Sequence, residues 1–248
     1  MNFIRSLLFN IVYATLTVTV GTLVTIGALF LPLPTVQKGL NVWLFSTVHA
    51  VRLICGLRIH QIGQRPQGDQ NFVVMSKHQS AWETFYLQLV FKPLSTILKR
   101  ELLRIPFFGW GLRLTEPVAI DRSNPLKALK QVKEQGIARL AKGRNLLVFP
   151  EGTRVAPGNQ QKYARSGADI AIAAGVPVVP VAHNAGHCWI NKKFTKQPGT
   201  ITVVIGDPIP TEGKTSRQLT EEVHAWIEAQ QAKIENLAQA DSTPDQGT

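Results

Sequence analysis

A histidine and a carboxylate stand five residues apart in the segment 77–83, Lys-His-Gln-Ser-Ala-Trp-Glu. An apolar strand candidate, residues 72–75, precedes this segment, and a helix candidate, residues 84–91, follows it. His78 is therefore predicted at a strand-to-helix junction, where a side chain can face substrate while packing fixes the elements on both sides. From the first helical turn, the Glu83 carboxylate can hold one imidazole nitrogen and leave the other to accept a proton. The spacing predicts a general base oriented by a carboxylate.

The same spacing also has a purely structural interpretation. Ser80-x-x-Glu83 is a capping box, in which the glutamate satisfies a backbone N–H at the start of a helix. Spacing alone leaves both interpretations open.

A second polar segment, Pro150-Glu151-Gly152-Thr153-Arg154, follows the predicted strand 146–149. Ligands bind at strand ends in α/β sheets. Gly152 permits a tight turn, Thr153 supplies a hydroxyl, and Arg154 supplies a planar fork suited to phosphate. An ordinary polar turn is the competing interpretation.

Composition indicates contact with an anionic, apolar partner. The formal net charge is +11, and 44% of the residues are hydrophobic but only 17% are charged. Anionic lipid and nucleic acid both attract such a chain. Because no RNA-binding aromatic signature, zinc-finger spacing or basic helix is present, we expect lipid and no nucleic acid. Two cysteines are too few for a disulfide framework and favour a reducing compartment.

The N-terminal segment is long and apolar. Residues 6–37 carry no charge, and residues 7–31 are long enough to span a bilayer. Arg5 raises the alternative of a signal peptide, but the apolar run is too long and lacks a cleavage site. A second apolar segment, residues 36–55, either crosses back or lies at the interface. Arg52 and Arg58, with the basic remainder, favour a cytoplasmic catalytic domain.

From residue 57 the pattern predicts an α/β fold, a mixed sheet of about seven strands flanked by helices, with an N-terminal apolar helix pair. We expect three parts: membrane-associated helices over residues 1–56, a catalytic domain over 57–238 and a flexible tail over 239–248. The strands are predicted at 58–62, 72–75, 95–98, 118–120, 146–149, 178–183 and 201–205, and the helices at 125–142, 167–174 and 217–237. His183, His187 and Cys188 lie close in sequence but lack a fourth ligand at regular spacing, so we expect no metal and a loop after a buried strand.

Four blocks in order resemble the glycerolipid acyltransferase family, best known from the 1-acyl-sn-glycerol-3-phosphate acyltransferases. His78 to Glu83 resembles the family's His-x4-Asp motif, although Glu83 replaces the usual aspartate with a side chain one methylene longer. Residues 119–122 resemble the second block, whose arginine, here Arg122, binds the substrate phosphate. Glu151-Gly152-Thr153-Arg154 matches the third block, and residues 176–181 resemble the apolar fourth block. Residues 99–109, which begin with Lys99, resemble the stretch before the second block.

The resemblance implies transfer of a fatty acyl group from an acyl thioester to a lysophospholipid hydroxyl at a membrane. His78 would be the base, Glu83 its orienting partner, and backbone N–H groups near Gly152 would hold the oxyanion. Arg122 and Arg154, helped by Lys99, would bind the phosphate, while Glu151, Gly152, Thr153 and Arg165 would support the site.

The expected partners are membrane lipids, a lysophospholipid acceptor, and acyl-CoA or acyl-acyl-carrier-protein as donor, with no cofactor and no metal. The expected location is a bacterial-type inner membrane, with the catalytic domain on its cytoplasmic side. Two alternatives remain open, namely an acyltransferase for another lyso-lipid, such as lyso-ornithine lipid, and a non-catalytic lipid-binding membrane protein.

Overall fold

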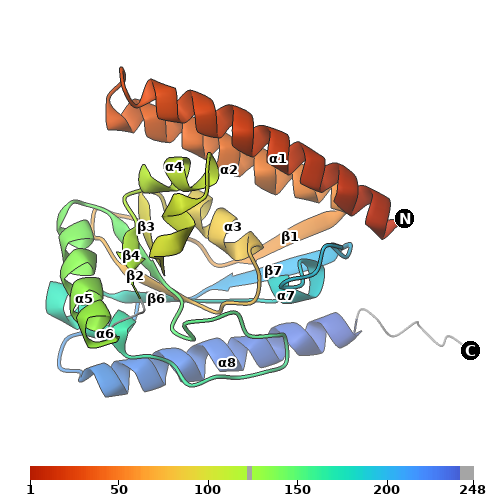
Figure 1. Cartoon of the computed structure of the whole chain (residues 1–248). Coiled ribbons are helices and arrows are strands. Elements are labelled where there is room, and N and C mark those ends of the chain that lie inside the picture. Colours follow the sequence, from red (N-terminus) through yellow and green to blue (C-terminus); the bar gives the residue numbers. More distant parts are fainter. Residues whose placement is uncertain (122–124, 241–248) are drawn as a thin grey trace, which may run out of the picture.

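The structure, a computed structural model, describes residues 1–121 and 125–240. Its described residues form a seven-stranded mixed sheet flanked by helices, which confirms the predicted α/β fold (Figure 1). In chain order the strands are β1 Leu57–Ile62, β2 Val73–Ser76, β3 Leu94–Lys99, β4 Val118–Ile120, β5 Asn145–Val148, β6 Val178–His183 and β7 Gly199–Ile205. Each lies within a few residues of its predicted position, because short apolar runs bounded by turn residues are typical of buried strands.

Helices cover both faces of the sheet. They are α1 Asn2–Gly27, α2 Leu33–Cys55, α3 Trp82–Val90, α4 Phe108–Arg113, α5 Pro125–Ala141, α6 Ser166–Ala174, α7 Ala185–Cys188 and α8 Ser216–Ala240, with a 3-10 helix at Arg100–Arg104. Most of the predicted tail, residues 241–248, and the predicted phosphate ligand Arg122 lie outside the described residues.

The strand order, β1-β7-β6-β2-β5-β3-β4, brings the predicted motifs together. All neighbouring pairs are parallel except β6 and β7, which are antiparallel. The carboxyl ends of β2, β5, β3 and β4 therefore meet at one edge of the sheet. The segments that follow these strands carry the motifs, and this edge is where α/β sheets bind ligands.

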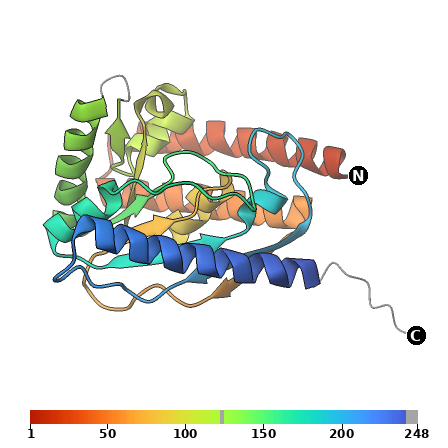
Figure 2. The same cartoon turned by 90° about the horizontal axis from the view of Figure 1, so that it is seen from below.

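Successive side chains of the central strands point to opposite faces of the sheet and pack into two separate hydrophobic cores. Val73 and Met75 of β2 pack on the side covered by α5, α6 and α8, whereas Val74 packs on the opposite side with α3. The view from below shows α8 lying across the sheet, on the face that α5 and α6 also cover (Figure 2). Both faces of the sheet are therefore buried, as expected for strands that read as continuous apolar runs.

The first two helices lie side by side as a hairpin over the α3 face (Figure 1). Phe9 of α1 is fully buried and belongs to the same core as strands β2 and β6. Near the N-terminus, Ser6 Oγ accepts a hydrogen bond of 2.9 Å from the backbone N–H of Lys196, and Asn2 donates to Gln197 at 2.8 Å. The hairpin is thus attached to the catalytic domain along one side.

The other side of the hairpin exposes large apolar side chains. These include Leu8, Ile11, Leu23, Phe30, Phe45 and Leu53, of which Leu53 is 84% exposed. Among the described helices, α1 alone is long and apolar enough to cross a membrane, with a mean hydropathy of 1.8. It ends at Gly27, earlier than the predicted span, because residues 28–31 turn before Pro32 opens α2.

Candidate active site

The segment after β2 brings the predicted base and its carboxylate into direct contact. His78 Nδ1 lies 2.8 Å from Glu83 Oε1, and Glu83 is fully buried in the first turn of α3. The extra methylene of glutamate is accommodated at ordinary hydrogen-bond length. The same carboxylate accepts the backbone N–H groups of Gln79 at 3.0 Å and Ser80 at 2.9 Å. Glu83 therefore serves both sequence interpretations, since it orients the imidazole and satisfies the start of the helix.

The environment of Glu83 keeps it ionised. Burial alone would raise the pKa of this carboxyl, but His183, the ring of His78 and the N–H of Ser80 outweigh burial and lower the pKa to about 2. A carboxylate that stays charged can fix the imidazole tautomer and stabilise the imidazolium formed on proton transfer.

Three further contacts fix the orientation of His78. Its ring stacks on Phe149 with centroids 3.9 Å apart and an interplanar angle of 17°. Its backbone N–H donates to Glu151 Oε2 at 2.8 Å, and its carbonyl accepts the N–H of Val155 at 2.8 Å. With Nδ1 turned to Glu83, Nε2 is the nitrogen available to a substrate.

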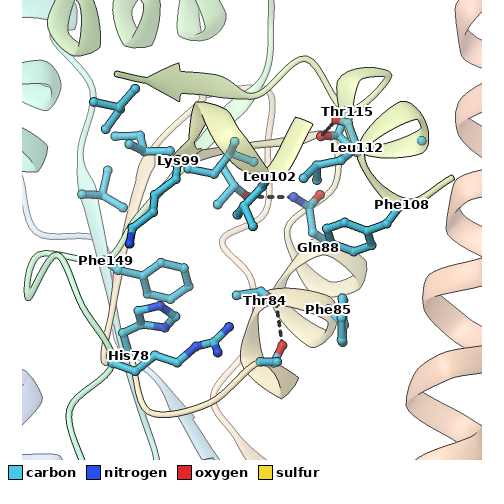
Figure 3. Close-up of a pocket in the computed structure, with 18 of the residues that line it drawn as sticks. His78, Thr84, Phe85, Gln88, Lys99, Leu102, Phe108, Leu112, Thr115 and Phe149 are labelled. Carbon is cyan, nitrogen blue, oxygen red and sulfur yellow. Dashed lines mark hydrogen bonds between the residues drawn. The ribbon is translucent and has the colours of Figure 1, made fainter. Parts of the chain in front are cut away.

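A cavity of about 890 Å³ opens beside this imidazole (Figure 3). At the His78 end it is lined by the polar residues Lys99, Thr153 and Arg154. The remaining wall is largely apolar, built from the N-terminal hairpin, α3, α4 and α5; it includes Tyr13, Val20, Leu40, Leu44, Phe85, Leu102, Phe108, Leu112 and Val132. The cavity can accept a ligand that has a charged group at one end and a long apolar part.

The cations predicted to bind phosphate differ in whether they line this cavity. Lys99 and Arg154 line it, both are exposed, and Arg154 Nη1 donates to Asn191 Oδ1 at 3.1 Å. In the close-up, the Lys99 side chain extends from the end of β3 toward Phe149 and His78 (Figure 3). Arg165 is exposed at the start of α6 and is not among the cavity-lining residues.

The other residues of the third motif, Glu151, Gly152 and Thr153, differ in what they contact. Glu151 is buried and faces the interior, where it holds the backbone of His78. Gly152 has φ +68°, a left-handed conformation that glycine adopts without strain. Its N–H donates to the Phe149 carbonyl at 3.0 Å, so this amide closes the turn, and the oxyanion donors near Gly152 stay a prediction. Thr153 is exposed and lines the cavity.

Comparison with known proteins identifies the family. Residues 56–184, which contain His78, Glu83 and Arg154, match the sequence model of the Acyltransferase family. The chain belongs to this family. A Pseudomonas aeruginosa relative, named 1-acyl-sn-glycerol-3-phosphate acyltransferase, is 42% identical over 98% of this chain and 96% of its own length.

More distant relatives of this acyltransferase share a shorter region. A coconut protein of the same name is 32% identical over 56% of this chain and 46% of its own length. The crystal structure of the 1-acyl-sn-glycerophosphate acyltransferase from Thermotoga maritima superposes with a TM-score of 0.81 at 23% identity. That match covers 94% of this chain and 96% of the other, and it shows that the two proteins share their fold.

The histidine and cysteine residues near β6 do not form a metal site. No group of three or more His, Cys, Asp or Glu side chains suited to a metal occurs in residues 1–121 and 125–240. His183 is not in a loop, as predicted, but is the last, fully buried residue of β6, and His187 and Cys188 lie in α7. The predicted bounds of the strand, 178–183, are confirmed and already included His183, so the loop interpretation is wrong for this residue, and residues 185–188 form a short helix in place of the loop.

Sequence reasoning assigned no role to two residues that hold His78. Phe149 supports its ring, and the buried Lys77 contacts the glutamate that binds its backbone. A lysine directly after a buried strand was a usable signal, because a buried ammonium needs partners. The stack with Phe149 had no such signal, since the aromatic residue completes an ordinary apolar run.

Proposed function

We propose that this acyltransferase moves a fatty acyl group from an acyl thioester to the sn-2 hydroxyl of 1-acyl-sn-glycerol-3-phosphate, giving phosphatidic acid. The observation that carries the proposal is the His78–Glu83 pair, with its carboxylate buried and its imidazole at the polar end of a long apolar cavity. The name of the Pseudomonas aeruginosa relative, which is similar along nearly its whole length, supports the choice of acceptor.

In this mechanism His78 Nε2 removes the proton from the acceptor hydroxyl as that oxygen attacks the thioester carbonyl. The new ester bond forms, the carbon–sulfur bond breaks, and the thiolate leaves. Because a thiol has a pKa of about 8.5, its thiolate leaves without strong acid assistance, and the imidazolium can return the proton. Glu83 stabilises the imidazolium throughout, and no covalent acyl-enzyme is required.

The acceptor phosphate would be bound by Arg154 and Lys99. Both line the His78 end of the cavity, and the arginine fork suits bidentate contact with phosphate. Arg122, outside the described residues, follows β4, whose last residue Ile120 lines the same cavity, and we assign it to the phosphate by its resemblance to the second block. Thr153 and Arg165 keep the supporting roles that the motif implies.

Acyl chains would occupy the apolar part of the cavity, between the hairpin and α3 to α5. We infer that the hairpin lies in one leaflet of an inner membrane, with the catalytic domain on the cytoplasmic side. Its attachment to the domain along one side and its apolar residues on the other support an interfacial position over a crossing. Substrate and product, both lipids, would then enter and leave at the depth of the headgroups.

The test is acyl transfer by purified full-length protein in mixed vesicles, with acyl-CoA and acyl-acyl-carrier-protein as separate donors. The acceptors are 1-acyl-sn-glycerol-3-phosphate, a lysophosphatidylcholine and a lyso-ornithine lipid. We expect transfer to the phosphate monoester at a rate at least tenfold above the other acceptors, because the loss or weakening of even one charged contact to the phosphate costs about 1.5–3 kcal/mol. Faster transfer to lyso-ornithine lipid would show that the protein is an acyltransferase for that lipid instead. Binding of the lipids without release of free thiol from the donor would contradict catalysis.

A further inference from the structure

Behind the base lies a buried ammonium that the proposed mechanism does not use. Lys77 is 1% exposed, and its Nζ donates to Glu228 Oε1 at 2.8 Å and to the Asn159 carbonyl at 3.3 Å. Glu151 Oε1 lies 2.9 Å from the same nitrogen, and its side chain is fully buried. Tyr163 donates its hydroxyl to Glu228 at 3.0 Å. One cation is thus held between two carboxylates on separate elements.

This cluster leads directly to the base. Glu151 uses its second oxygen, Oε2, to accept the backbone N–H of His78 at 2.8 Å. A continuous chain therefore runs from Glu228 on α8 through Lys77 and Glu151 to the residue that would remove the proton. Burial raises the pKa of Glu151, and Lys77 opposes that effect by stabilising the charged form. The cation thereby maintains Glu151 as a strong acceptor for the His78 N–H.

A second chain joins the same helix to the same segment. Gln231 Oε1 accepts the backbone N–H of His183 at 2.9 Å. The His183 ring lies with Nδ1 3.2 Å from the N–H of Ala185 and Nε2 2.9 Å from the carbonyl of Lys77. Because Nδ1 faces a donor and Nε2 faces an acceptor, the neutral tautomer with a proton on Nε2 satisfies both. His183 therefore holds the carbonyl of the residue immediately before the base.

Both chains start from one side of α8. Glu228 and Gln231 are three residues apart, which places them on neighbouring positions of one helix face. The other buried residues of α8 are the apolar Leu219, Val223, Ile227 and Ile234 and a single threonine, Thr220, whose hydroxyl donates to the Ser216 carbonyl of the same helix. All of α8 lies outside residues 56–184, the part that matches the family model.

Stability alone does not explain these polar residues. Apolar residues of similar volume usually stabilise a core as well as a buried ion pair does, because taking charges out of water is costly. We propose that α8 positions the base, with Glu228 acting through Lys77 and Glu151 on the backbone of His78, and Gln231 acting through His183 on the carbonyl of Lys77. These are positioning residues, and the inference rests on the proposed role of His78 as general base.

The first test compares Glu228→Gln with Glu222→Gln. Both changes remove one negative charge from α8, but Glu222 pairs with Lys214 at the surface. We expect Glu228→Gln to lower kcat about tenfold while KM for donor and acceptor stays within twofold, because a small displacement of the base affects the reacting geometry more than binding. Glu222→Gln should match the wild type. Equal kcat values for the two variants would overturn the proposal.

The second test separates positioning from stability by replacing the whole charged cluster with neutral residues. In Lys77→Met/Glu151→Gln/Glu228→Leu neither an unpaired ammonium nor an unpaired carboxylate is left in the core, so we expect thermal stability close to that of the wild type. We expect kcat to remain at least tenfold low, because a neutral amide oxygen is a weaker acceptor for the His78 N–H than a carboxylate held by a cation. A triple variant that is stable and fully active would show that the charged cluster is structural only.

A third measurement does not depend on turnover. The imidazole ¹⁵N resonances of His78 should shift in Glu228→Gln and stay unchanged in Glu222→Gln. If the wild type transfers no acyl group but these resonances respond, the proposed function fails while the positioning chain stands. If transfer is normal and the resonances of His78 do not respond, the positioning chain fails alone.

Discussion

The two sides of the candidate active site differ in how firmly the protein holds them. On the base side, Glu83 and Lys77 are almost completely buried, and His78 is fixed through its ring, its N–H and its carbonyl. On the phosphate side, Lys99 and Arg154 are exposed, and Arg154 donates a hydrogen bond to the neutral amide of Asn191.

This difference separates two tasks. Proton transfer requires reacting atoms in one geometry, so its groups are set before substrate arrives. Phosphate recognition tolerates side chains that adjust to the ligand, since long cations can close on a dianion as it binds. Changes on the base side should therefore act mainly on kcat, and changes on the phosphate side mainly on KM for the acceptor.

The largest expected effect comes from removing the base. His78→Ala should lower kcat about 10³-fold, within the range contributed by a positioned general base, with little change in KM for either substrate. The matched control is His187→Ala, which removes an exposed imidazole of α7 that pairs with Glu235 of α8. Acyl transfer by His78→Ala at the wild-type rate would remove His78 from the mechanism.

The second-largest effect on kcat should come from replacing the carboxylate that orients His78. Glu83→Gln should lower kcat about 10²-fold, because a neutral amide does not stabilise the imidazolium and offers an N–H where Ser80 already donates. Initial-rate measurements at saturating acceptor would show it. Glu235→Gln, which alters an exposed histidine–glutamate pair, should be close to the wild type. A Glu83→Gln enzyme limited only in KM would contradict the division of tasks.

The base side was also the more predictable side from sequence. His78 and Glu83 are only five residues apart, between a strand and a helix, so their contact depends mainly on the local chain and can be predicted from it. Seven strands were predicted because apolar runs must be buried whatever surrounds them. Lys77 and Glu228 are 151 positions apart in the sequence, and His183 and Gln231 are 48 apart. No local sequence pattern predicts such contacts. The cavity, likewise, forms only when the hairpin packs over α3 and α4.

Acid stability gives a separate measure of the base side. The pKa of Glu83 is about 2 in the folded protein, below the usual value of 4.5, so its ionisation stabilises the fold above pH 4.5. That contribution, about 3 kcal/mol for a shift of this size, is lost as the pH falls from 4.5 toward 2. In urea titrations, the advantage of the wild type over Glu83→Gln should be largest near neutral pH and shrink across this window. A constant difference would mean that Glu83 is not held ionised.

The smallest effects should distinguish two arginines of the phosphate side. Arg154→Gln should raise KM for 1-acyl-sn-glycerol-3-phosphate about tenfold and change kcat less than threefold, since one charged contact to phosphate contributes about 1.5–3 kcal/mol. Arg165 lies eleven residues later and outside the cavity lining, so its role is supporting only, and Arg165→Gln should raise KM for the same acceptor clearly less, by about two- to threefold.

An assay of both arginine variants with lysophosphatidylcholine as acceptor tests further whether Arg154 binds the phosphate, because the phosphate of this lipid is a diester. The defect of Arg154→Gln should be smaller with this acceptor, because a monoanionic phosphate attracts the guanidinium less strongly than a dianion does. If Arg165→Gln showed the larger defect with the phosphate monoester, the acceptor would bind beside α6, and the exposed side of the site would extend beyond the cavity mouth.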